Sequence, residues 1–533
     1  WSSDVCSSDH MRRIALQLDF GPLVFMGKCV VVAAVVFTVF MTAHADEQPA
    51  VSSSRIRELE DLASHQAKTL GATHPNLAKT LHSLGLAHLQ EGASDKAGDL
   101  LEKSLSIRSK SLAPIDLETG ETLDALITAR LNQGRFEECE PLLASQEAFH
   151  RKLFGADDLL TIRTLIVLAD TQFLLRHHDD AEKTYLEALG RLTTTVGEDH
   201  LNTAKALQGL GRNYFQCGKY VQAEQLFRKA LAIREKLLGS KDQSVAESLD
   251  LLAQCLSCLG KDAEAEQVYK TLLQLSTTSD GAGSLQTADV MQSLALLYAG
   301  QGKWAEAESL AKQSLAISEQ AIGDRGRETG NSLMSLGLLY TTQKKFAQAE
   351  PLFRRALGIF ERVLGNEHTD TVIANSSLAL MYWHAGNHAE ADRLYRSTLR
   401  YFETAFGPSH PLTAQILNNL AANLHFLGDY PQAATLAERA VQIHIRSLGQ
   451  SHPTTALSLI NLSVIKAAQD KWYESAELRE RGQRAMRSRC YDSLAALLPD
   501  EQIAFLLGDY AIAHHSALSI GLRQSSSPRI RTL

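Results

Sequence analysis

The chain repeats itself every 42 residues, and this period limits what it can fold into more than any other feature. Counting by 42 from Gly71, nine of the ten positions are glycine, and the exception is Ala113. Thirteen residues after each of these starts, all ten positions are leucine, from Leu84 to Leu462. The phase holds without an insertion. Self-similarity at a fixed period of this size is typical of a solenoid, in which each repeat packs only against its neighbours.

Each repeat predicts two helices joined by a tight turn. Numbering positions from 0 at the glycine, helix A runs from about position 4 to 20, because Leu207, Leu210 and Tyr214 share one helical face. Position 21 is glycine in seven repeats, which suits the left-handed residue that ends a helix. Helix B begins near position 24, and its alanines, such as Ala223, mark a close-packed seam. Aromatic residues at position 23 are expected to wedge into the hairpin.

Position 3 carries residues that predict helix starts. Aspartate or serine occurs there in four repeats and reads as an N-cap. Histidine occurs there in five others (His74, His200, His368, His410 and His452). Metal ligands must converge within a few Å, whereas these histidines are spread along the array. We therefore interpret them as turn and capping residues, and we predict no metal site.

These residues resemble the tetratricopeptide repeat, with its Leu-Gly-x-x-Tyr, glycine and alanine-aromatic-alanine pattern. The 42-residue form with G-x-x-H-P-x-T-A is similar to the kinesin light chain subtype. The resemblance covers residues 71–490 and implies an all-α fold: a right-handed superhelical solenoid of about ten helical hairpins. It also implies a protein–protein interaction scaffold that holds a peptide or protein partner in a concave groove lined by helix A.

In that frame, positions 8, 11, 12 and 15 of helix A face the groove. The polar residues there are the candidate partner-binding residues, and Asn418-Asn419 matches the Asn-Asn-Leu-Ala of light chain-like repeats, whose amides bind a ligand backbone. An amide suits this role because it offers both a donor and an acceptor. The candidates are Lys205, Gln208, Arg212, Asp250, Gln254, Gln292, Asn331, Asn418, Asn419 and Asn461.

Composition and motifs exclude other classes of function. The net charge is −8, with charges of both signs interspersed along helix faces, which argues against nucleic acid as a partner. The one C-x-x-C, Cys255 to Cys258, has no second pair or βαβ context, and we interpret its cysteines as partly buried helix residues. No phosphate-binding, serine hydrolase or zinc protease motif occurs. We expect no enzyme activity, no cofactor and no small-molecule substrate.

The N-terminal 70 residues predict an exported protein. Residues 1–10 resemble translated sequencing adapter and are set aside. Residues 11–45 have a basic start, a twelve-residue apolar run (Val30 to Met41) and an Ala43-His44-Ala45 cleavage site, the anatomy of a signal peptide. Cleavage after Ala45 would place the protein in the periplasm or outside the cell. The alternative is an uncleaved anchor at residues 23–43, the one case in which a membrane would be a partner. Residues 46–70 are expected to form a capping helix.

The chain leaves the repeat phase after residue 490. Residues 491–522 predict a C-terminal capping helix or linker, and residues 523–533 a low-complexity or artefactual tail. The stretch from Leu498 to Leu522 is similar to the segment that joins repeats to a caspase-like peptidase domain in bacterial proteins of the CHAT class. An alternative function is therefore the sensor arm of such a peptidase, with its catalytic domain missing from this chain.

Overall fold

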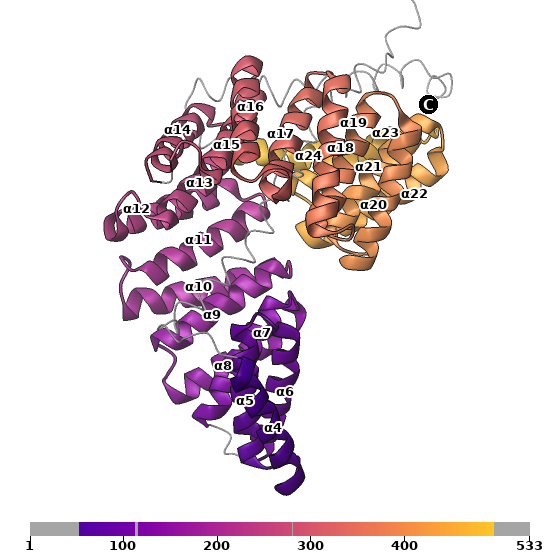
Figure 1. The fold of residues 1–533 in the computed structure, drawn as a ribbon. Helices are drawn as coiled ribbons and strands as arrows, with labels where there is room; N and C mark the ends of the chain where they lie inside the picture. Colours follow the sequence, from indigo (N-terminus) through magenta and orange to yellow (C-terminus); the bar gives the residue numbers. More distant parts are fainter. Residues whose placement is uncertain (1–52, 112–115, 280, 495–533) are drawn as a thin grey trace, which may run out of the picture. The chain divides into compact units, whose positions relative to one another are not determined.

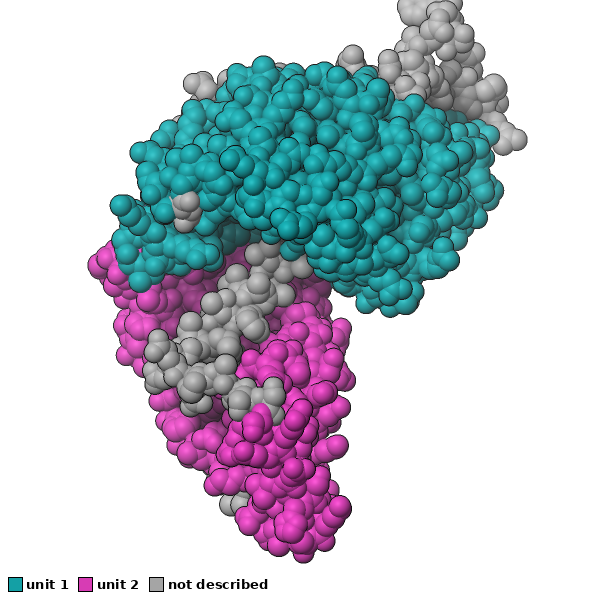
Figure 2. Space-filling model, in the orientation of Figure 1, with its two compact units in different colours: residues 1–27, 214–231, 238–533 teal, residues 28–213, 232–237 magenta. Residues whose placement is uncertain are grey.

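A computed structural model describes residues 53–111, 116–279 and 281–494, and these residues form helices without any strand. They divide into two compact units (Figure 2): residues 53–213 with 232–237 form the described part of one, and residues 214–231 with 238–494 that of the other. The leader, the segment from residue 495 onward and Ala113 lie outside the described residues, and the expectations for them stay predictions.

Each 42-residue step holds one helix A and one helix B, which make one hairpin (Figure 1). Helix A begins at position 4, and helix B begins at position 23. The A helices are α5 (Pro75–Gln90), α7 (Leu117–Asn132), α9 (Leu159–Leu174), α11 (Leu201–Gln216), α13 (Gln243–Cys258), α15 (Leu285–Gly300), α17 (Arg327–Thr342), α19 (Thr369–His384), α21 (Pro411–Leu427) and α23 (Pro453–Ala468).

The B helices follow them in the same order. They are α6 (Ser94–Ser111), α8 (Phe136–Leu153), α10 (His178–Thr195), α12 (Tyr220–Leu238), α14 (Asp262–Ser279), α16 (Trp304–Ala321), α18 (Phe346–Leu364), α20 (His388–Ala405), α22 (Tyr430–Leu448) and α24 (Trp472–Leu494). We number the hairpins 1 to 10, from α5–α6 to α23–α24. A short 3-10 turn, η2 (Gly323–Arg325), precedes α17, and α4 (Ser53–Thr69) packs against α5.

Within each unit the hairpins stack in chain order. Helix A packs against its own helix B, as α15 does against α16, and helix B packs against the next helix A, as α16 does against α17. Successive A helices also touch, as α15, α17, α19 and α21 do in turn. The A helices therefore form one continuous layer through this stretch. The result is a solenoid of helical hairpins, the architecture that the period predicts.

The turn at position 21 requires a left-handed residue in every repeat. All seven glycines at this position have a positive φ, Gly218 for example at 75°. The three repeats without glycine keep the same geometry, with Arg176 at 64°, Lys344 at 58° and Asp470 at 61°. A side chain in this region costs about 1–2 kcal/mol. The hairpin geometry thus overrides local preference at these three turns.

Two kinds of side-chain hydrogen bond stabilise the start of helix A. Each position-3 histidine is an N-cap whose Nδ1 accepts a backbone N–H two residues on, as His368 does from Asp370 at 3.1 Å. The threonine at position 6 donates its hydroxyl to the carbonyl of the position-0 glycine, as Thr371 does to Gly365 at 2.8 Å. The same bond occurs in seven repeats, at Thr161, Thr203, Thr287, Thr329, Thr371, Thr413 and Thr455.

The core of each hairpin follows the predicted seam. The small residue at position 26 is fully buried throughout the array, including Cys139, which replaces alanine in hairpin 2. At position 30 a large side chain such as Phe353 fills the space left by a small residue at position 14 of helix A. A Cβ built on Gly337 in hairpin 7 would lie 3.0 Å from the Phe353 ring. A side chain at Gly337 would therefore fit only if the Phe353 ring shifted.

The aromatic residues expected to wedge into the hairpin at position 23 are the first residues of helix B, and their burial varies. Tyr220 and Phe346 pack against the hydrophobic core, whereas Trp304 is 42% exposed. Positions 26 and 30 are more completely buried. The helical stretch also passes the expected end of the repeats at residue 490, because α24 continues to Leu494.

Some adjacent hairpins are joined by a glutamate on helix B that bonds residues of both hairpins, and we call this arrangement the carboxylate clamp. The pattern within one repeat does not reveal it. Glu266 at position 27 of hairpin 5 bonds Lys270 of its own helix at 2.7 Å. It also bonds two residues of hairpin 6: Lys303 at 2.9 Å and the Tyr298 hydroxyl at 3.2 Å. Hydrogen bonds from the two lysines lower the pKa of Glu266 to about 2. The clamp is therefore an ionised, multiply bonded group in neutral solution.

The clamp recurs at the next two junctions. Glu308 bonds Lys312 at 2.7 Å, and in hairpin 7 it bonds Lys345 at 3.2 Å and the Tyr340 hydroxyl at 3.1 Å. Glu350 accepts a hydrogen bond from Tyr382 of hairpin 8 at 2.7 Å. Hairpins 5 to 8 are thus joined at matching positions by polar contacts as well as by the apolar core.

Candidate functional site

The ten candidate groove residues all lie on A helices, but they are divided between the two units. Lys205, Gln208 and Arg212 belong to α11 in the first unit. The other seven belong to α13, α15, α17, α21 and α23 in the second unit.

The α11 residues form a cationic cluster around one carboxylate. Lys205 Nζ lies 4.0 Å from Asp170 Oδ2 of α9, and Asp170 is only 4% exposed. Asp170 also accepts a hydrogen bond from the fully buried Tyr185 hydroxyl. Burial lowers the pKa of Lys205 against the attraction of Asp170, and the nearby positive charges of Arg212 and Arg163 lower it further. Several cations therefore share a single carboxylate on this face.

Two members of this cluster differ in how they are satisfied. Gln208 is 4% exposed and accepts a hydrogen bond from Arg234 of α12, so it braces its own hairpin. Arg212 is half-buried, and its Nε has no hydrogen-bond partner among the described residues. A buried guanidinium donor without a partner is costly. The cluster thus has unused capacity to bind an anionic group.

In the second unit, the side-chain amides of the candidates on α13 and α15 form hydrogen bonds with other side chains of the protein. Gln254 donates to Asp250 at 2.6 Å within α13. Gln292 is 8% exposed, and it reaches from α15 to α17, where it donates to Ser332 at 3.1 Å and accepts from Ser335 at 2.9 Å. Gln292 therefore joins successive A helices.

The asparagine pair on α21 is arranged differently. Asn418 and Asn419 are each 6% exposed. The acceptor Oδ1 of Asn418 and the donor Nδ2 of Asn419 have no hydrogen-bond partner among the described residues. The Oδ1 of Asn419 accepts a hydrogen bond from the Gln415 amide at 3.5 Å. Adjacent residues thus present one unpaired acceptor and one unpaired donor, the two groups that a peptide bond can satisfy.

The two remaining candidates, Asn331 on α17 and Asn461 on α23, are partly exposed. Sequence reasoning selected the candidates because the family resemblance places positions 8, 11, 12 and 15 of helix A toward the groove. Four of them, Gln208, Gln292, Asn418 and Asn419, are less than a tenth exposed. Helix A neighbours stand close enough in the stack to cover positions 11 and 12. Asp170 and Arg163 were missed, although they occupy positions 15 and 8 of repeat three.

The cysteines of the C-x-x-C motif lie near the end of α13. Cys255 is buried and its thiol donates to the Tyr220 carbonyl at 3.2 Å, while Cys258 is partly buried. Burial raises the pKa of the Cys255 thiol, which keeps it protonated. Across the described ranges no group of three or more His, Cys, Asp or Glu side chains is placed to hold a metal ion. None of the helices described here is long and apolar enough to cross a bilayer.

Stacked two-helix repeats with alanine seams and left-handed turns define a helical-repeat solenoid. The model of the tetratricopeptide repeat matches eight overlapping segments, residues 118–194, 178–236, 203–278, 244–320, 286–362, 328–404, 370–444 and 412–488. Together they span more than half of the chain. The chain belongs to the tetratricopeptide repeat family, whose members are typically non-catalytic scaffolds for protein–protein interaction.

Solved structures with similar folds were also found, whereas a search of the curated proteins gave no match. BtubC (BKLC) from P. vanneervenii is 20% identical, with a TM-score of 0.35, over 44% of this chain and 92% of its own. Kinesin light chain TPR-like repeats from Podosopora anserina are 22% identical, with a TM-score of 0.33, over 38% and 97%. A Rap protein complexed with Competence and Sporulation Factor is 15% identical, with a TM-score of 0.45, over 69% and 98%. The family assignment therefore depends on the repeat model.

Proposed function

We propose that the helix A face of this scaffold binds a protein or peptide partner in a groove. The observation that supports the proposal most directly is the pair of unpaired amide atoms on Asn418 and Asn419. An unpaired buried polar group costs roughly 1–3 kcal/mol. A partner whose backbone supplies the missing donor and acceptor removes that cost, so the pair favours binding of an extended peptide segment over a purely structural role.

The cationic cluster supports the same proposal in the other unit. A carboxylate of the partner would accept a hydrogen bond from the Nε of Arg212 and pair with the ammonium of Lys205. Charge-assisted hydrogen bonds are the stronger kind. We further propose that the chain is not an enzyme and needs no cofactor, and that its partners include neither nucleic acid nor a small-molecule substrate, in line with its net charge of −8.

A peptide library displayed on phage and selected on the full chain tests the groove. The double variant Asn418→Ala/Asn419→Ala should weaken the selected peptides about tenfold, because two hydrogen bonds are lost. Lys205→Glu should weaken those peptides that carry a carboxylate. Lys312→Ala on α16 is the matched control and should leave the dissociation constants unchanged. Peptides that bind all four proteins equally would exclude the helix A face.

We propose that the chain is exported and that its leader is removed after Ala45. The support is the apolar run from Val30 to Met41 followed by Ala43-His44-Ala45. N-terminal sequencing of secreted protein should then begin at Asp46. A start at Met11 would contradict cleavage and favour the anchor at residues 23–43.

The alternative, a sensor arm of a caspase-like peptidase, depends on residues 498–522, which lie outside the described residues. The gene itself distinguishes the two functions. A further coding region with a histidine and cysteine pair beyond Leu533 would favour the peptidase arm, and its absence the independent scaffold.

A further inference from the structure

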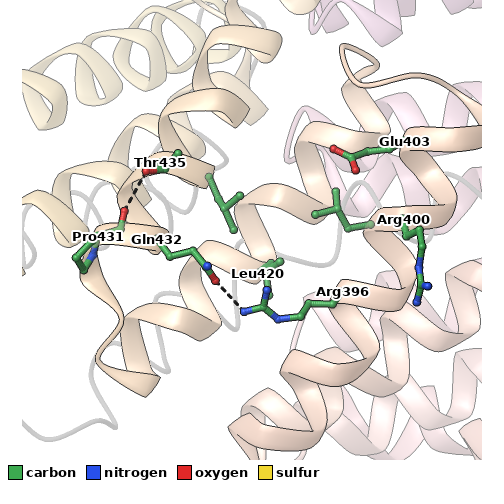
Figure 3. A pocket seen from close by; sticks show the side chains of 9 residues that line it. Arg396, Arg400, Glu403, Leu420, Pro431, Gln432 and Thr435 are labelled. Carbon is green, nitrogen blue, oxygen red and sulfur yellow. Dashed lines mark hydrogen bonds between the residues drawn. The ribbon is translucent and has the colours of Figure 1, made fainter.

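A pocket lies beside two neighbouring B helices of the second unit. The pocket has a volume of about 650 Å³ and is lined by α20 and α22 and by Leu420 of α21. Figure 3 shows the side chains that line it. Leu399 and Leu436 form its apolar sides. Its edge carries polar groups from both B helices, namely Arg396, Arg400, Glu403, Gln432 and Thr435. The pocket is thus apolar inside and charged at its edge.

The pocket opens at a junction where the carboxylate clamp is replaced. Positions 27, 17 and 22, which carry Glu266, Tyr298 and Lys303 at an earlier junction, are here Asp392, Leu424 and Asp429. Asp392 bonds Arg396 of its own helix at 2.7 Å, so it does not reach hairpin 9.

The charges at the edge leave one cation unmatched. Arg396 is paired with Asp392 and donates to Gln432 at 2.8 Å. Glu403 is paired with Arg439 at 2.7 Å. Arg400 is exposed, and its guanidinium has no hydrogen-bond or ion-pair partner among the described residues.

The repeat register shows that Arg400 is unusual for its place. It stands at position 35, where six of the seven preceding repeats have a small residue: Ser106, Ala148, Gly190, Ala232, Ala316 and Gly358. An arginine therefore replaces a small side chain in the hairpin that borders the pocket.

We infer that this pocket binds a partner protein through a segment in which leucine-type side chains stand next to a carboxylate. The apolar side chains fill the space over Leu420, and the carboxylate pairs with Arg400. The net excess of one positive charge at the edge matches one acidic residue. This site lies on α20–α22 and does not depend on the helix A groove.

The probe is the fluorescein-labelled peptide Gly-Gly-Leu-Leu-Glu-Gly-Gly, and the measurement is its fluorescence polarisation with the full chain. The same peptide with Gln in place of Glu should bind about tenfold more weakly, since a charge-assisted hydrogen bond is lost. Arg400→Ala should weaken binding of the Glu peptide by a similar factor and leave binding of the Gln peptide unchanged. That pattern isolates the pairing of Arg400 with the carboxylate.

Two further variants separate the pocket from general charge effects. Thr435→Trp places an indole at an exposed position of the pocket edge and should block both peptides without disturbing the core. Arg393→Glu removes an exposed arginine on α20 that is paired with Glu390 and does not line the pocket, and it should leave binding unchanged. A ligand of a single small pocket is expected to have a dissociation constant of about 1 mM or lower. The inference is overturned if the Glu peptide shows no binding to the unaltered chain at that concentration. Equal binding to the unaltered chain, Arg400→Ala and Thr435→Trp would also overturn it.

Discussion

Phe353→Ala should destabilise the chain by about 3–5 kcal/mol, the range for removing a buried phenylalanine. Its ring is fully buried in the largest described core, which runs through hairpins 6 to 10. It also fills the space beside Gly337, so alanine would leave a cavity that the glycine backbone cannot close. Urea unfolding should show the loss, and native-state hydrogen exchange should place it in α17 and α18.

Trp304→Ala is the matched control, because this aromatic residue is 42% exposed at the start of α16. It removes a larger side chain but much less buried surface, and it should cost less than half as much. A loss as large as that of Phe353→Ala would show that position 23, rather than position 30, carries the packing of the hairpin.

Leu294→Ala should cost about 2–5 kcal/mol, because this leucine is 3% exposed in the core that runs through hairpins 4 to 6. It stands at position 13, the one position that is leucine in all ten repeats. A stack of repeats unfolds with several transitions more readily than a single compact domain, so the urea midpoint should be read together with hydrogen exchange in α15.

Lys312→Ala is the comparison for this variant. The lysine side chain is 56% exposed, and its bond to Glu308 belongs to the weak, exposed class of about 0–1 kcal/mol. The substitution should be close to neutral. If the two variants lost equal stability, the assignment of positions 13 and 31 to core and surface would be incorrect.

Sequence alone predicted the elements of this fold well, because each depends on contacts within one repeat. The leucine of position 13 and the alanine of position 26 mark helix faces that any single hairpin must bury. The left-handed turn was likewise visible in the glycines of position 21. What periodicity did not reveal is that Arg176, Lys344 and Asp470 keep the same turn without glycine.

Contacts between hairpins were beyond prediction for a geometric reason. Glu266 and Lys303 are 37 residues apart, on helices whose relative register is set only when two hairpins stack. The same register decides that Gln292 meets Ser332, and so becomes buried, although its helical position places it toward the groove. The pocket beside Arg400 depends on two neighbouring repeats at once. A pattern read one repeat at a time contains none of these relations.

The Glu266 and Glu308 clamps make the mechanical coupling of hairpins 5 to 7 dependent on ionic strength. Their lysines, Lys303 and Lys345, are about two-fifths exposed, so dissolved salt screens the attraction. The apolar contacts beneath them are insensitive to such screening. In dilute buffer these hairpins should open cooperatively, and in concentrated salt each should fluctuate more independently of its neighbour.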